Sequence, residues 1–216
     1  MVDQASSAIV VGAGGHGRVV IDALYKCEIE ITGIVDPSLA EQDSVFGVPV
    51  LGDDAWFDDR STTEGLLYNG VGANPDLKRR QNIYVSLTNK GWQFGQLVHP
   101  FSSVGMDVEL GDGVQLMAGV VVQAGTQIGE NVVVNTGALI DHDCIIGRHC
   151  FISPGVNMCG TVSVGSAAFI GAGATILPGV EVPSGCVIGA GSVVTRSLAG
   201  KGIYVGNPAR LMRSRQ

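Results

Sequence analysis

The sequence predicts a parallel β-helix of six-residue repeats that follows a small α/β domain. Starting at Val98, every sixth residue is aliphatic for 17 successive positions, the last being Val194. A period of six fits neither an α-helix nor a simple strand, and it is typical of a β-helix built from hexapeptides. Before about residue 97 this register is missing, and apolar strands alternate with helical segments, as in a parallel α/β sheet.

A second register supports the β-helix. Two residues before each aliphatic position stand mostly small or β-branched residues, and alternate residues of a strand share a face, so both sets point into one narrow core. Glycine follows many of the aliphatic positions, where we expect it to supply the positive φ of a sharp corner. Four of these glycines recur every 18 residues, which predicts three hexapeptides per coil: Gly111, Gly129, Gly147 and Gly165.

The first part of the chain carries its own series of elements. Asn74-Pro75 is a good start for the last helix, with Pro at its first position. We expect strands at residues 8–12, 29–35, 45–51 and 66–71, and helices near 16–27, from 53 or 54, and near 75–90. The predicted domains are an α/β domain at 1–96, a β-helix at 97–195 and a basic C-terminal tail at 196–216.

A glycine motif joins the first strand to the first helix. Gly12, Gly14 and Gly17 satisfy G-x-G-x-x-G, and Asp36 ends the next strand. Bare backbone at a helix N-terminus binds phosphate, and such a carboxylate can hold a ribose hydroxyl. Alone, the motif indicates an NAD-dependent oxidoreductase. However, about ninety residues form only a half-Rossmann-like domain, so one nucleotide diphosphate fits better. His16 either donates to a phosphate or sugar oxygen or caps the helix.

Charge and composition exclude several classes of protein. The net charge of −7 argues against nucleic-acid binding. The chain starts without a basic, apolar leader and has no apolar run near 18 residues, so we expect a cytoplasmic protein without a membrane partner. The last 21 residues hold five bases against one in the repeats, so the tail either meets a polyphosphate ligand or is solvated.

Cysteine usage points to packing rather than to metal. The inner register includes three cysteines, Cys144, Cys150 and Cys186, which we interpret as reduced core thiols. Because no CxxC or His-rich spacing is present, we predict no metal site.

His142 is the candidate catalytic residue of the repeats. It lies in Asp141-His142-Asp143, at a corner between hexapeptides, where side chains project outward. A nearby carboxylate orients imidazole and raises its basicity, as a general base near neutral pH requires. The alternative is an ordinary surface histidine in a turn.

These features together resemble one family. The chain is similar to the left-handed β-helix acyltransferases of nucleotide sugars and sialic acids. The similarity rests on the hexapeptide array and on three motifs: Gly-Ala-Gly-Gly-His-Gly at 12–17, Ile-Asp-His-Asp-Cys at 140–144 and Gly-Asn-Pro-Ala-Arg at 206–210. That family includes the bacillosamine and perosamine N-acetyltransferases and the sialic acid O-acetyltransferases. The resemblance implies a left-handed winding and a homotrimer with acetyl-CoA between neighbouring prisms. Few charged side chains on the prism faces favour the same assembly, because apolar surface must be covered.

The resemblance also implies roles for individual residues. His142 would remove a proton from the acceptor amine, with Asp143 strengthening the base and no metal required. The backbone N–H of Gly160 would serve as oxyanion donor. The pantetheine arm of acetyl-CoA would run along Ala172 and Ala190. The nucleotide sugar would lie at Gly14, Gly15, His16 and Asp36.

One difference from the family leaves more than one acceptor sugar possible. The bacillosamine-type enzymes carry a second histidine where this chain has Phe151, with His149 two residues earlier. We therefore expect N-acetylation of a UDP- or GDP-linked 4-amino-4,6-dideoxy sugar, with sialic-acid-type O-acetylation as the alternative. A zinc hydratase would need three converging histidines, and a non-catalytic scaffold would not need an outward Asp-His-Asp.

Overall fold

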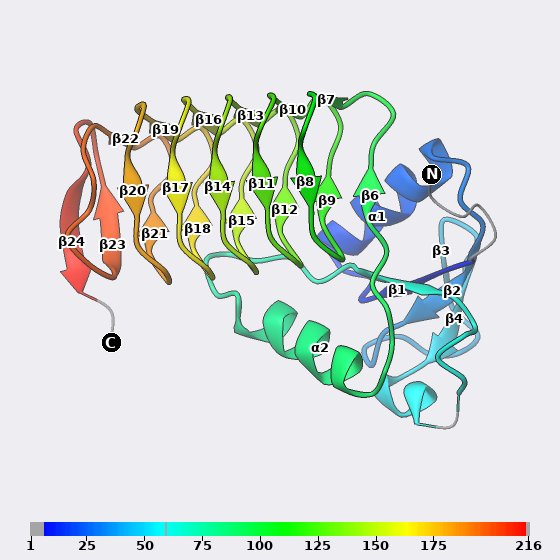
Figure 1. Cartoon of the computed structure of the whole chain (residues 1–216). Coiled ribbons are helices and arrows are strands. Elements are labelled where there is room, and N and C mark those ends of the chain that lie inside the picture. Colours follow the sequence, from blue (N-terminus) through cyan, green and yellow to red (C-terminus); the bar gives the residue numbers. More distant parts are fainter. Residues whose placement is uncertain (1–6, 59, 215–216) are drawn as a thin grey trace. The chain divides into compact units, whose positions relative to one another are not determined.

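The computed structural model describes residues 7–58 and 60–214, and the chain forms two compact units, Met1–His99 and Pro100–Gln216. The first unit is a small α/β sheet with helices, and the second is a prism of stacked coils (Figure 1). The predicted fold class, an α/β domain followed by a parallel β-solenoid of hexapeptides, is confirmed.

The α/β unit is built on a short parallel sheet. Its strands are β1 (Ala8–Val11), β2 (Ile31–Val35), β4 (Val48–Gly52) and β5 (Leu66–Asn69), in the order β4-β2-β1-β5, with β3 (Ser44–Val45) antiparallel to β4. Every residue of β1 is buried, as expected for a strand covered on both faces. Ile9 and Val11 face a cluster with Tyr84 and Leu87 of α2 (Lys78–Asn89).

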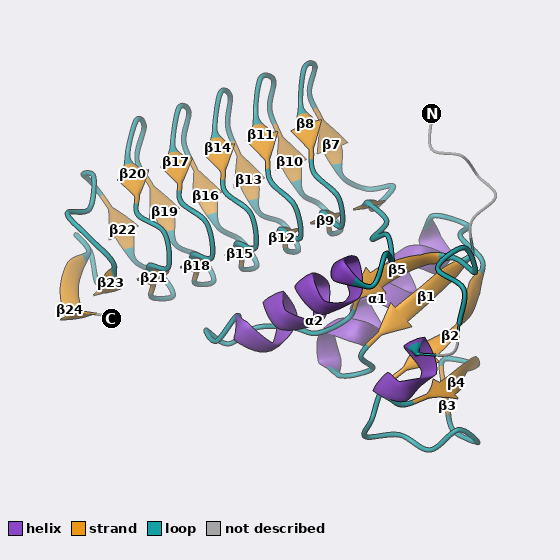
Figure 2. Cartoon of the chain, turned by 60° about the horizontal axis from the view of Figure 1, so that its bottom comes forward, coloured by secondary structure: helices purple, strands orange, loops and turns teal. Residues whose placement is uncertain are grey.

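The other helix, α1 (Gly15–Lys26), is amphipathic and buries one side. Its Val20, Ile21 and Leu24 are fully buried, and each such side chain contributes about 2 kcal/mol. Figure 2 shows both helices of this unit beside the sheet. Neither helix of the described chain has the length and apolar content that crossing a bilayer requires.

Three predicted elements of the α/β unit were wrong in detail. The predicted strand at 45–51 is a tight hairpin of β3 and β4, because Phe46 and Gly47 adopt positive φ. The helix expected from 53 or 54 is a single 3₁₀ turn, η1 (Asp54–Phe57), whose start Asp53 caps. The last helix begins at Lys78 rather than at Pro75, since the Asp76 carboxylate accepts from the Lys78 N–H.

In the prism, two-residue strands stack into three parallel sheets. Each residue pairs with the one 18 positions later, such as Val122 with Ile140, which confirms three hexapeptides per coil. One face holds β7 (Ser103–Val104), β10 (Val121–Val122), β13 (Leu139–Ile140), β16 (Asn157–Met158), β19 (Thr175–Ile176) and β22 (Val193–Val194). The next holds β8 (Glu109–Leu110), β11 (Gln127–Ile128), β14 (Ile145–Ile146), β17 (Ser163–Val164) and β20 (Glu181–Val182).

The third face ends in the segment that the sequence analysis set apart as a basic tail. It contains β9 (Gln115–Leu116), β12 (Val133–Val134), β15 (Phe151–Ile152), β18 (Phe169–Ile170) and β21 (Val187–Ile188), then β23 (Gly202–Val205) and β24 (Arg210–Ser214). β23 continues the parallel sheet and β24 returns antiparallel to it. β6 (Leu97–Val98) lies at the end of the first unit.

The two sequence registers form the prism core. From Val114 to Val194 nearly all of these side chains are fully buried. No disulfide forms among the five cysteines, which all lie within the described residues, and Cys144, Cys150 and Cys186 are buried as predicted. Burial raises the pKa of the Cys150 thiol to about 12, so it stays protonated.

The glycines after the aliphatic positions have a different purpose from the one predicted. None of them has a positive φ. Instead, a Cβ atom on Gly111 would lie 2.6 Å from the Glu130 nitrogen of the next coil, so glycine permits the coils to stack closely. The positive φ recurs two residues later, at every sixth residue from Asp107 to Gly191. Asp143 and His149 are among the non-glycine residues that adopt it.

Candidate functional site: the Asp-His-Asp corner and the glycine loop

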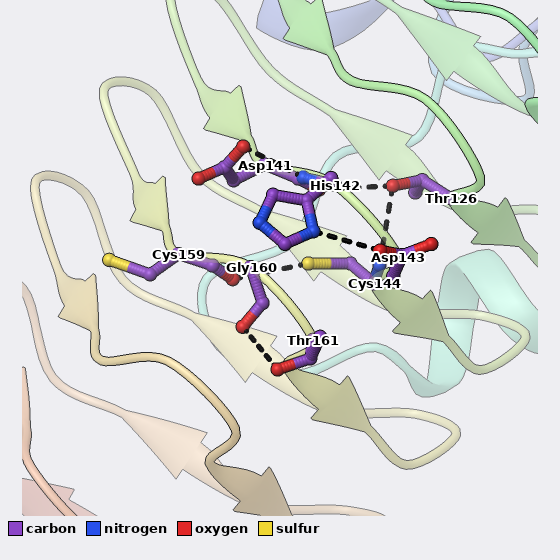
Figure 3. Close-up of polar contacts among 8 residues, drawn as sticks. All are labelled: Thr126, Asp141, His142, Asp143, Cys144, Cys159, Gly160 and Thr161. Atoms are coloured by element: carbon purple, nitrogen blue, oxygen red, sulfur yellow. Dashed lines mark hydrogen bonds and ion pairs between the residues drawn. The ribbon is translucent and has the colours of Figure 1, made fainter.

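His142 projects outward from the turn between β13 and β14 (Figure 3), and its side chain is 57% exposed. Its Nδ1 lies 2.8 Å from Asp143 Oδ2, and its backbone N–H donates to Asp141 Oδ1 over 2.8 Å. The turn is fixed to its neighbours, because Asp143 N–H donates to the Ala124 carbonyl and Thr161 N–H to the His142 carbonyl. These hydrogen bonds fix the turn, and the His142 imidazole on it faces solvent.

The carboxylates around His142 make it a stronger base. The hydrogen bond to Asp143 raises the pKa of His142, and the charge of Asp141 raises it further. With Nδ1 engaged by Asp143, Nε2 is the nitrogen that faces outward to take a proton. This arrangement suits a general base that works near neutral pH.

Gly160 lies against the same imidazole from the next coil. A Cβ atom at this position would be 2.5 Å from His142 Nε2, so only glycine leaves the ring room. Within residues 7–58 and 60–214, the Gly160 N–H donates no hydrogen bond. The residue that packs against the His142 ring therefore carries a backbone N–H without an acceptor in the described parts of the chain, the kind of group that an oxyanion site uses.

Ala172 and Ala190 lie apart from this corner. Both are exposed and stack in neighbouring coils, where Gly191 N–H donates to the Ala172 carbonyl over 2.8 Å. Ala172 follows Gly160 by 12 residues of an 18-residue coil, so it occupies a different corner. Within one chain, the structure does not bring these alanines to His142.

In the α/β unit, the glycine loop packs tightly at some positions and is open at others. A Cβ atom on Gly17 or Gly70 would overlap the Gly12 carbonyl oxygen, so these glycines allow the loop, helix and β5 end to interlock. Gly14 and Gly15 are exposed and nothing would meet an added Cβ atom. With the partly buried His16 they form the start of α1, whose first N–H groups have no intrahelical partner.

Asp36 is buried and tied to this loop. Its Oδ2 accepts from Ala13 N–H over 2.6 Å, and its Oδ1 accepts from the Ser38 N–H over 2.8 Å and the Ser38 hydroxyl over 2.5 Å. Burial acts to raise the pKa of Asp36, but these hydrogen bonds and the charge of Arg79 outweigh it and lower the pKa. The structure therefore places Asp36 beside the glycine loop as an ionised carboxylate.

A cavity of about 440 Å³ opens at the carboxyl ends of β1, β2 and β5. Such crevices are the usual ligand sites of open α/β sheets. Besides Gly12, Val35 and the carboxylates of Asp54 and Asp76, its walls include four α2 residues that were not predicted as site residues: Lys78, Arg79, Asn82 and Ile83. The basic run at 78–80 was a visible signal, because two cations at a cavity wall can hold a phosphate or a carboxylate.

The neighbouring Arg80 is fully buried behind this wall. Its Nη1 donates to the carbonyls of Asn69 over 2.8 Å and Val71 over 2.9 Å, and Asn69 Nδ2 donates back to the Arg80 carbonyl. Its Nε and Nη2 have no partner among the described residues, and burial lowers the pKa of the guanidinium. Arg80 thus holds the end of β5, from which Val71 lines the cavity.

His149 and Phe151 have structural contacts. Phe151 stacks on Phe169 with ring centroids 5.8 Å apart, and His149 is buried with its Nδ1 3.0 Å from Asn131 Nδ2. Over the described ranges, no group of three metal-ligating side chains is present.

Comparison with protein families divides the chain in the same way. Residues 7–87 match the PglD N-terminal domain. Residues 107–142 and 125–160 match the bacterial transferase hexapeptide, and residues 161–196 match the hexapeptide repeat of succinyl-transferase. Comparison with curated proteins found no match.

Among solved structures, PerB from Caulobacter crescentus in complex with CoA and GDP-perosamine is 38% identical, with a TM-score of 0.88 over 96% of this chain and 97% of that one. The chain belongs to the nucleotide-sugar acetyltransferases of the hexapeptide-repeat type. The predicted resemblance is thereby confirmed, and the protein is an acyltransferase.

This acetyltransferase also resembles two further structures. A histidine-to-asparagine variant of perosamine N-acetyltransferase from Caulobacter crescentus, with CoA and GDP-perosamine, is 36% identical over 96% of this chain and 97% of that one, with a TM-score of 0.88. The acetyltransferase domain of PglB from Neisseria gonorrhoeae, with acetyl coenzyme A, is 32% identical over 96% and 99%, with the same TM-score.

Proposed function

We propose that this acetyltransferase transfers the acetyl group of acetyl-CoA to the 4-amino group of a nucleotide-linked 4-amino-4,6-dideoxy sugar, with His142 as general base. The observation that carries the proposal is the outward imidazole of His142, held by Asp143 over 2.8 Å and facing Gly160. The 38% identical PerB, solved with CoA and GDP-perosamine, supports the donor and the acceptor class.

The reaction needs one base and one oxyanion donor. Nε2 of His142 takes a proton from the amine as the amine nitrogen attacks the thioester carbonyl. The Gly160 N–H donates to the oxygen that becomes negative, and Asp143 stabilises the imidazolium. When the C–S bond breaks, the CoA sulfur leaves as the thiol after taking the proton, and His142 returns to its neutral form.

The α/β unit would hold the nucleotide of the acceptor. Its phosphates would meet the N–H groups at Gly14, Gly15 and His16, where the dipole of α1 favours negative charge. Asp36 would bind a ribose hydroxyl, since an ionised carboxylate is an acceptor. The similarity to PerB favours a GDP-linked acceptor over a UDP-linked one.

A homotrimer would complete the donor site. His142 and Gly160 lie on one corner of the prism and the exposed Ala172 and Ala190 on another. One pantetheine arm that contacts both sets is most simply accommodated between two neighbouring copies. Because both substrates are cytoplasmic metabolites, we place the enzyme in the cytoplasm.

A thiol-release assay tests the proposal. Purified protein and acetyl-CoA are offered GDP-, UDP- and dTDP-linked 4-amino-4,6-dideoxy sugars beside free sialic acid. We expect release with a 4-amino sugar nucleotide, fastest for the GDP-linked one. Release with sialic acid alone would overturn the N-acetyltransferase assignment in favour of O-acetylation.

A further inference from the structure

A buried hydroxyl from the preceding coil bridges the turn that carries His142. Thr126 lies on the inner register and is fully buried. Its Oγ1–H donates to the Asp141 carbonyl over 3.0 Å, and the Cys144 N–H donates to Thr126 Oγ1 over 3.3 Å (Figure 3). The hydroxyl thus joins both ends of the Asp141–Cys144 turn.

The same kind of link recurs one coil further on the same corner, where Cys144 Sγ donates to the Cys159 carbonyl over 3.2 Å at the start of the next turn. Turns at another corner close directly, as where the Val120 N–H donates to the Met117 carbonyl over 3.2 Å. At the His142 turn the Thr126 hydroxyl makes the link. The inner register is otherwise mostly apolar, and burying a hydroxyl there is costly unless it is hydrogen-bonded.

The residue beside Thr126 contacts the same turn from below. A Cβ atom on Gly125 would lie 2.6 Å from Asp143 Oδ1, so glycine leaves space for that carboxylate. Asp143 has a φ of 55°, the left-handed conformation that recurs at this position of every hexapeptide and that Asp tolerates better than most residues. Gly125 and Thr126 therefore form a floor under the His142–Asp143 pair.

We propose that Thr126 is a positioning residue, whose hydroxyl sets the opening of the Asp141–Cys144 turn and so holds Asp143 in hydrogen-bonding reach of His142. This inference rests on the proposed function of His142. A hydroxyl is suited to the task because it donates to one end of the turn and accepts from the other. Valine has the same shape but can do neither.

The titratable groups around His142 predict how loss of the Thr126 hydroxyl would change the pH dependence of the reaction. Asp141 and Asp143 flank His142 on its own turn, Cys144 lies inside the turn, and Cys159 lies on the following coil (Figure 3). The Asp143 hydrogen bond is the main cause that raises the pKa of His142. A displaced Asp143 lowers that pKa towards its usual value, so the neutral imidazole persists to lower pH.

The test compares Thr126→Val with Thr126→Ser in the full-length protein. For Thr126→Val we expect kcat to fall on the order of 10- to 100-fold, as small misplacements at a reacting centre do, with KM for both substrates changed less than about twofold. The acid limb of its pH–rate profile moves to lower pH. Thr126→Ser keeps the hydroxyl and retains the kcat and pH profile of the parent.

Two further variants keep the test decisive. Val132→Ala removes core volume on the same register and is expected to lower the melting temperature without moving kcat or the pH profile. Gly125→Ala pushes on the Asp143 carboxylate without touching the hydroxyl, so it shifts the acid limb even if Thr126→Val fails to fold.

The inference is overturned if Thr126→Val keeps the parental kcat and acid limb, or if Thr126→Ser loses as much activity as Thr126→Val. If Thr126→Val fails to fold, Thr126→Ala is measured in its place, and a parental kcat and acid limb in that variant overturn the inference. Full activity of His142→Ala would instead remove the proposed base, a separate failure.

Discussion

The two units of this acetyltransferase hold their functional polar groups in opposite ways. In the α/β unit, Asp36 and Arg80 are buried, and each binds the backbone that shapes the candidate nucleotide site. In the prism, His142 stands on an exposed corner above a core that is almost entirely apolar. In the first unit the residues beside the proposed nucleotide site therefore also hold the fold, whereas in the prism the proposed base itself lies outside the core.

The largest expected effect tests that separation in the prism. His142→Ala removes the proposed base, and general base catalysis contributes about 10²- to 10⁴-fold, so we expect kcat to fall by that amount. Because the side chain is 57% exposed, the melting temperature should stay within about 2 °C of the parent. Steady-state kinetics and thermal denaturation on one preparation measure both. A large fall in melting temperature would mean that the corner supports the fold.

The next effect is on stability, in the α/β unit. Arg80→Met leaves the buried carbonyls of Asn69 and Val71 without their donor, so we expect the free energy of unfolding to fall by about 2 kcal/mol. Because Val71 lines the cavity, KM for the nucleotide sugar should rise with it. Urea denaturation and kinetics measure the two. The control is the exposed Arg79→Met, which should keep the parental stability. Equal stability of the two variants would contradict a stabilising role for the two Arg80 hydrogen bonds.

The smallest effect depends on pH. The folded pKa of Asp36 lies below its unfolded value, so its ionised form stabilises the fold above the ordinary carboxyl pKa of about 3.9. Asp36→Asn replaces one of the two accepting oxygens with an NH₂ donor, so either the Ala13 N–H or Ser38 loses its acceptor, which should cost about 1–2 kcal/mol at neutral pH. The difference from the parent should shrink as pH falls through the folded pKa, where Asp36 is neutral in both states. Denaturation curves at several pH values measure it, and a pH-independent difference would refute the explanation.

The repeat made most of the prism predictable. A period of six with an 18-residue glycine spacing defines the coil, because every hexapeptide places the same kinds of side chain in the core. The same period placed His142 on a corner. The role of the glycines after the aliphatic positions was missed, because a repeat in the sequence does not show how closely the backbones of neighbouring coils approach. Thr126 was recognised only as a β-branched core residue.

The α/β unit was predictable in outline but not in its contacts. Its strands and α1 follow from apolar runs and glycine spacing. The two bonds of Arg80 to the end of β5 join residues 9 and 11 positions apart, and no periodicity indicates them. Because Pro favours the first position of a helix, the predicted helix began at Pro75 and not at Lys78. The cavity wall formed by Lys78, Arg79 and Asn82 was therefore overlooked.

The most direct test of the central claim is a calorimetric titration of the His142→Asn variant with CoA and with a GDP-linked 4-amino-4,6-dideoxy sugar. If the prism separates chemistry from fold and binding, both ligands bind with the affinity of the parent protein while turnover is lost. Loss of CoA or sugar-nucleotide binding together with turnover would contradict the account, because His142 would then build the site rather than act in it.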